Sequence, residues 1–89
     1  MQYYKNVCGN NEFVWLSIEP GENKKILRWA KQMGCVWFDG TEIDPEEEVN
    51  SCYFSMSNDG KFDVLPVSTW FSNDPNLKKV LRCRCKFTY

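Results

Sequence analysis

Residues 52–65 read CYFSMSNDGKFDVL and contain the clearest folding signal in the chain. Apolar and polar residues alternate on both sides of a central Asn-Asp-Gly turn at 58–60, which is the pattern of a β-hairpin. A two-residue loop at 59–60 pairs apolar with polar residues, whereas a three-residue loop over 58–60 pairs like with like: Met56 with Phe62 and Phe54 with Val64. The second register also places Gly60 where a left-handed backbone is required, and it is the register that we predict.

Two segments upstream of the hairpin predict a strand and a helix. Residues 13–18 (FVWLSI) are apolar on both faces, which indicates an interior strand covered on both sides. Residues 22–33 repeat apolar side chains at helical spacing, with lysines and an arginine on the remaining surface. Gly34 suits the left-handed position after the last turn. We therefore expect an amphipathic helix over 22–33.

Shorter segments complete the predicted fold. Residues 35–38 (CVWF) indicate a second strand, and residues 3–7 a short one. Residues 81–89 alternate apolar with mostly cationic side chains, which predicts a half-buried strand with a basic outer face. The class is α+β: one amphipathic helix packed on a mostly antiparallel sheet of four or five strands.

Length and composition restrict the function classes. The 89 residues, 16% of them aromatic, predict a single domain over residues 1–89 and exclude intrinsic disorder. No apolar run approaches the roughly 20 residues of a membrane span, and the first residues lack the apolar stretch of a signal peptide, so we expect a cytoplasmic protein. Without histidine, a nucleophile elbow or a glycine-rich phosphate loop, we expect no enzymatic activity and no cofactor.

The cysteines are odd in number and form no Cys-x-x-Cys pair: Cys8, Cys35, Cys52, Cys83 and Cys85. A disulfide scaffold or a zinc knuckle normally shows closely spaced pairs of thiols. We interpret most of them as small core hydrophobes in a reducing compartment. The alternative is a metal chelate in which Cys83 and Cys85 are joined by one of the other three.

Charge is segregated along the chain, although the formal net charge is only −1. Between Lys31 and Lys61 there is no base but seven acids: Asp39, Glu42, Asp44, Glu46, Glu47, Glu48 and Asp59. After Pro75 there is no acid but five bases: Lys78, Lys79, Arg82, Arg84 and Lys86. A molecule with this layout can steer partners of either sign, depending on which face meets them.

The acidic loop, expected over residues 41–49 and taken together with Asp39 in the turn before it, is the first candidate site. It is either an ordinary solvated loop or a surface that docks a partner and occupies a groove built for phosphates. Residues 44–48 lack the alternation of a calcium-binding loop, so a metal site is disfavoured. We assign partner contacts to the loop acids and to two aromatic residues between prolines: Asp39, Glu42, Asp44, Glu46, Glu47, Glu48, Trp70 and Phe71.

The basic face of the last strand is the second candidate site. Arg82, Arg84 and Lys86 would stand in a row about 6.5–7 Å apart, near the phosphate spacing of a nucleic acid. Trp70 or Phe71 could stack a base beside them. The competing interpretation is the solvent face of an edge strand, where cationic side chains discourage edge-to-edge pairing.

The chain resembles a class of short phage-encoded accessory proteins, most without assigned function. The residues that carry the resemblance are WAKQMGCVWFDG at 29–40, YFSMSNDGK at 53–61 and the later Trp70-Phe71. The resemblance covers about residues 12–71 and implies a phage protein working in the host cytoplasm. It transfers no catalytic residue, and neither the acidic loop nor the basic strand belongs to the shared pattern.

We therefore expect a small non-enzymatic, phage-encoded protein that binds a host protein through its acidic loop. Such contact would inhibit or redirect the host protein, for example a defence system. The alternative is a nucleic-acid or nucleotide-binding module that uses the basic strand. A third hypothesis is a homo-oligomer that sequesters a small ligand.

Overall fold

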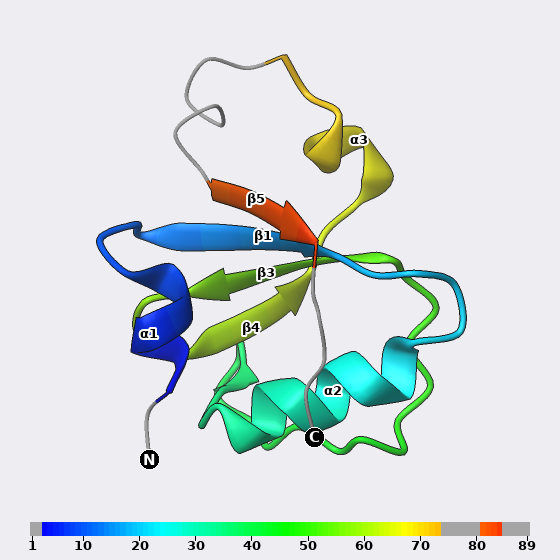
Figure 1. Ribbon diagram of the computed structural model, residues 1–89. Helices are drawn as coiled ribbons and strands as arrows, with labels where there is room; N and C mark the ends of the chain where they lie inside the picture. Colours follow the sequence, from blue (N-terminus) through cyan, green and yellow to red (C-terminus); the bar gives the residue numbers. More distant parts are fainter. Residues whose placement is uncertain (1–2, 74–80, 85–89) are drawn as a thin grey trace.

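The computed structural model of the chain describes residues 3–73 and 81–84 (Figure 1). Its elements are α1 (Tyr4–Cys8), β1 (Phe13–Ser17), α2 (Asn23–Gln32), β2 (Val36–Trp37), β3 (Tyr53–Ser57), β4 (Lys61–Val64), α3 (Val67–Trp70) and β5 (Leu81–Arg84). The five strands form one sheet, in the order β2-β4-β3-β1-β5. The predicted α+β class is confirmed. None of the helices in the described ranges is long and apolar enough to span a membrane.

The sheet has an antiparallel centre and two parallel margins. β3 pairs antiparallel with both β1 and β4, whereas β2 joins β4 and β5 joins β1 in parallel. Parallel neighbours need a crossover connection, and both parallel pairs join strands that are not consecutive in the chain. The sheet is thus mixed rather than all antiparallel, and the direction of its outer strands was not predictable, because the alternation of a sequence indicates which face is buried and not which way a strand runs.

The hairpin of β3 and β4 has the predicted register. Phe54 lies opposite Val64 and Met56 opposite Phe62. The turn closes through the N–H of Gly60, which donates to the carbonyl of Ser57 at 3.1 Å. Gly60 has a φ of 86°, the left-handed conformation that the three-residue loop demands.

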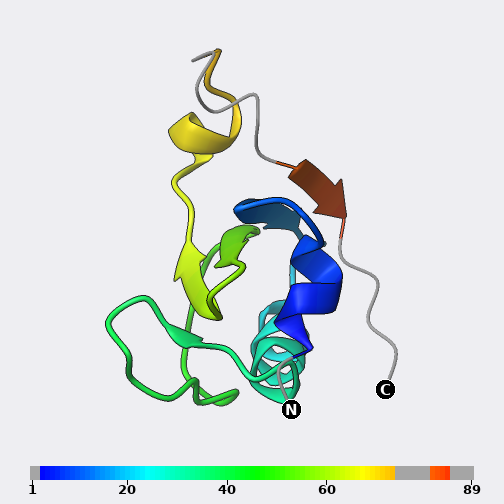
Figure 2. The same cartoon turned by 90° about the vertical axis from the view of Figure 1, so that its left-hand side faces the viewer.

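The core lies between α2 and one face of the sheet (Figure 2). Ile26, Leu27 and Ala30 of α2 are buried, as the helical periodicity predicts. β1 is covered on both faces, because Val14 and Leu16 belong to this core while Trp15 is buried on the opposite face. The prediction of an interior strand at 13–18 is therefore confirmed.

Two local expectations differ from the structure. Residues 3–7 do not form a strand: α1 places Tyr4 and Cys8, four residues apart, on one buried helical face. The short helix α3, which follows Pro66, was not predicted, because four residues are too few to show helical periodicity. The last strand was predicted over residues 81–89, and β5 confirms it for residues 81–84. Residues 85–89 lie outside the described residues.

Candidate partner-binding surface

The acidic loop lies in the connection between β2 and β3 and is fixed by its own hydrogen bonds. Ile43 is buried in the core and anchors the loop to the body of the protein. The Asp39 carboxylate accepts hydrogen bonds from the N–H and the hydroxyl of Thr41, at 3.0 and 2.7 Å. The Asp44 carboxylate accepts one from the N–H of Glu46 at 3.0 Å. These turns shape the backbone and leave all six loop acids exposed: Asp39, Glu42, Asp44, Glu46, Glu47 and Glu48.

Most of the negative charge of the acidic loop is not neutralised within the described part of the chain. Glu46 pairs with Lys24 of α2 at 3.1 Å, and both side chains are largely exposed. Within residues 3–73 and 81–84, the carboxylates of Glu42, Glu47 and Glu48 form no ion pair. The hydrogen bond from the Thr41 side chain lowers the pKa of Asp39, which keeps that carboxylate ionised. The loop therefore presents a cluster of negative charge to water.

An apolar hollow adjoins the acidic loop, and the aromatic ring of Phe38 stands at its edge. The hollow has a volume of about 360 Å³ and is lined by Trp37, Phe38, Asp39, Thr41, Glu47, Val49, Asp63 and Val64. Phe38 is 65% exposed, which is the largest exposure among the big hydrophobic side chains of the described residues. The surface thus combines an exposed aromatic ring with a margin of carboxylates.

Sequence reasoning missed Phe38 because it assigned the residue to an apolar strand. β2 ends at Trp37, and the chain turns at once, with the N–H of Gly40 donating to the carbonyl of Trp37 at 2.8 Å. The Asp39-Gly40 pair was the signal available in the sequence. A turn immediately after Phe38 removes it from the sheet before a neighbouring element can cover it.

Trp70 contacts the protein itself rather than standing free for a partner. Its ring centroid lies 5.0 Å from that of Tyr53 and 6.2 Å from that of Trp15, and the side chain is half-buried. Phe71 meets Tyr53 edge-on at 5.9 Å and remains 63% exposed. Of the two predicted aromatic contacts, Phe71 is the accessible one.

The described cationic side chains of β5 make intramolecular contacts, although both remain exposed. The Arg82 guanidinium lies 4.9 Å from the Trp15 ring and 5.6 Å from the Trp70 ring. Arg84 forms an ion pair with Glu19. The third predicted residue of this row, Lys86, lies outside the described residues. Both described arginines therefore have partners within the chain.

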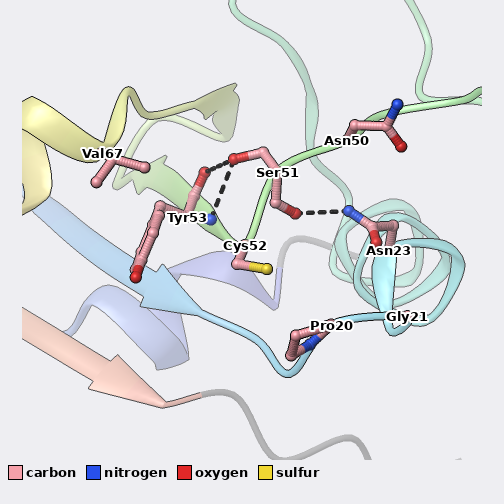
Figure 3. Close-up of a pocket in the computed structure, with 8 residues that line it drawn as sticks. All are labelled: Pro20, Gly21, Asn23, Asn50, Ser51, Cys52, Tyr53 and Val67. Carbon is pink, nitrogen blue, oxygen red and sulfur yellow. Dashed lines mark hydrogen bonds between the residues drawn. The ribbon is translucent and has the colours of Figure 1, made fainter.

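A second hollow lies where the chain enters α2 and β3 (Figure 3). It has a volume of about 330 Å³ and is lined by Pro20, Gly21, Asn23, Asn50, Ser51, Cys52, Tyr53 and Val67. The Asn23 amide donates to the carbonyl of Ser51, and the Ser51 hydroxyl donates to the carbonyl of Tyr53 at 3.1 Å. These hydrogen bonds hold the wall of the hollow in place. Its residues come from three separate segments, 20–23, 50–53 and Val67, so no local pattern predicted it.

Three of the described thiols belong to the interior, whereas Cys52 is half-buried and lines the second hollow. Cys8 and Cys35 are buried, and Cys83 packs against the core. Burial raises the pKa of the Cys35 thiol to about 12, so it stays protonated at neutral pH. Among the described residues, no three acids or cysteines are grouped as metal ligands. The interpretation of Cys8 and Cys35 as core hydrophobes is consistent with their burial.

Comparison of the chain with protein-family models, curated proteins and solved structures gives no match. The functional argument therefore depends on the geometry of the surface.

Proposed function

We propose that this chain is a small non-enzymatic protein that binds a positively charged surface of another protein and blocks or redirects it. The observation that supports this function is the adjacency of exposed Phe38 to the acidic loop, whose carboxylates are mostly unpaired within the described residues. In line with the resemblance of its sequence, we place the protein in a phage and its partner in the cytoplasm of the host.

The surface contains the two components that a protein interface needs. An exposed aromatic ring such as Phe38 can serve as an anchor that becomes desolvated in a pocket of the partner. Carboxylates around that anchor steer a basic partner and reject acidic ones. Because the loop is held by Ile43 and by its own turns, little order has to be gained on binding.

Association suits this surface better than catalysis. The loop carboxylates are exposed to water, whereas general acid–base chemistry depends on groups enclosed in a site that excludes water. The basic strand supports a nucleic-acid function less well, because Arg82 and Arg84 are engaged with Trp15, Trp70 and Glu19.

Charge reversal in the acidic loop tests the proposal. Wild-type protein is used to capture partners from a host lysate, and the affinity of the captured, purified protein is then measured by calorimetry. We expect E47K/E48K to weaken binding at least about tenfold, because it replaces attraction by repulsion at the contact. This pair leaves the Lys24–Glu46 contact intact, and E46K/E47K/E48K should weaken binding further.

E12K is the matched control for E47K. Both substitutions reverse one exposed glutamate and change the net charge equally, but Glu12 lines none of the hollows described above. Salt weakens the interaction between exposed charges that are not in direct contact, so E12K should alter the affinity by less than about twofold. Equal affinity of wild type and E47K/E48K for the captured protein would overturn the proposal.

A further inference from the structure

The hollow beside Phe38 is the first of three neighbouring hollows on this surface. A third hollow, of about 350 Å³, lies between the other two. It shares Glu47 and Val49 with the hollow beside Phe38. It shares Gly21, Asn23 and Asn50 with the hollow that reaches α3. Because neighbouring hollows share lining residues they adjoin one another, and we treat them together as one groove that runs from the end of β2 past the acidic loop to the start of α3.

The groove is apolar at both ends and acidic between them. Phe38 marks one end, and Val67, which is 57% exposed, marks the other. Glu47 and Glu48 line the middle. The one base that lines these hollows is Lys24, and its ammonium group is already paired with Glu46. An occupant of complementary chemistry is therefore cationic in its centre and apolar towards its ends.

The wall of the groove offers a free main chain. Residues 48–50 belong to no helix or strand. Within the described part of the protein, their backbone N–H and C=O groups form no hydrogen bond. Glu48 and Asn50 are exposed residues, and Val49 between them is half-buried against the core. An extended polypeptide can pair with such a stretch through its own main chain, as in strand addition.

We propose that this groove docks an extended, cationic segment of the partner protein. The inference rests on the proposed function and specifies the part of the partner that is bound. Lysine or arginine side chains of that segment face Glu47 and Glu48, its main chain pairs with residues 48–50, and apolar side chains contact Phe38 and Val67. A segment of about ten extended residues spans roughly 33 Å. The longest dimension of the protein is 34 Å, so this length is enough to cross the groove.

Selection from a display library of random peptides about ten residues long tests the shape and charge of the occupant. The wild-type protein is the bait, and E47K/E48K is used for counter-selection. We expect enriched peptides with central lysines or arginines and flanking apolar residues. Methylation of alternate backbone nitrogens should weaken their binding at least about tenfold, because it removes main-chain donors. Amide resonances of residues 48–50 and Val67 should shift on binding.

Three results would overturn the inference. The first is that no peptide is enriched on the wild-type protein relative to E47K/E48K. The second is that the enriched peptides become helical when they bind. The third is that methylation of their backbone nitrogens does not change their affinity. If host-protein capture still depends on Glu47 and Glu48 in any of these cases, the proposed function stands and the partner uses a folded surface instead. If capture of the host protein does not depend on the acidic loop at all, both proposals fail.

Substitutions at the two ends of the groove provide an independent test with the selected peptides. F38S and V67S should each weaken peptide binding about threefold to tenfold, because each removes an apolar contact. F13S is the control, since Phe13 is also exposed, at 42%, and lines none of the hollows. Loss of binding in F13S equal to that in F38S would contradict the assignment.

Discussion

Gly60 combines a conformational requirement with a steric one. Its φ of 86° is strained for residues that carry a Cβ atom. A Cβ atom at this position would also lie 2.8 Å from two ring carbons of the buried Tyr4. The hairpin turn and α1 are far apart in the chain but contact each other here. Glycine at position 60 leaves room for the ring of Tyr4.

The substitution G60A should therefore destabilise the protein by about 2–4 kcal/mol, the sum of a left-handed alanine and an overpacked ring. G21A is the matched control, because Gly21 has a φ of 90° but no atom within 4 Å of an added Cβ. We expect G21A to lose only about 1–2 kcal/mol. Urea denaturation measures both losses, and equal values would show that the Tyr4 contact has no energetic effect.

At the scale of elements, Arg82 links α3 to the sheet. Its guanidinium lies within 5.6 Å of the Trp15 and Trp70 rings, one from β1 and one from α3. Trp70 in turn packs against Tyr53 of β3. A short helix such as α3 has little stability of its own, so these contacts supply most of what holds it.

We expect R82M to loosen α3 and to lower the free energy of unfolding by about 1–2 kcal/mol, because it keeps an apolar stem but removes the cation over two rings. R84M is the control on the same strand. It breaks only the exposed pair with Glu19, worth about 0–1 kcal/mol. Hydrogen exchange of residues 67–70 and urea denaturation measure the effects. If R84M cost as much as R82M, the bridging role of Arg82 would be wrong.

At the scale of the whole molecule, the acidic loop and the basic face of β5 differ in how many of their charged side chains lack a partner within the described residues. The acidic loop presents the carboxylates of Glu42, Glu47 and Glu48 without ion-pair partners among the described residues, whereas both described arginines of β5 have partners within the chain. Acidic and basic residues are separated along the sequence, and β2, from which the acidic loop starts, and β5 lie at opposite edges of the sheet. The described arginines of β5 also make contacts within the chain.

We therefore expect no saturable binding of single- or double-stranded oligonucleotides at low salt, up to about 100 µM protein, by fluorescence anisotropy. Non-specific nucleic-acid binders typically show dissociation constants of about 1–100 µM even at physiological salt. Binding that falls steeply with salt and is abolished by R82M/R84M would favour the nucleic-acid alternative over the proposed function.

Much of the fold was predictable because its signals are local. The 58–60 turn fixed the pairing of β3 with β4, and the helical stripe fixed α2 to within a residue or two. The exposure of all six loop acids was also predictable, since an acidic segment without apolar periodicity has no face to bury. The orientation of β5 beside β1 was not, because strand direction depends on the path of the connection.

The sequence by itself determined the hairpin of β3 and β4, the strand β1 and the helix α2, the faces that they bury, and where negative charge is concentrated, but not the short helices α1 and α3. Periodicity and turn residues act within one element, so they can be read along the chain. Only the tertiary structure decided that Phe38 is exposed, that Trp70 and Arg82 contact one another, and that three hollows adjoin one another. Those properties depend on which distant element covers a side chain, and that is settled by packing in three dimensions.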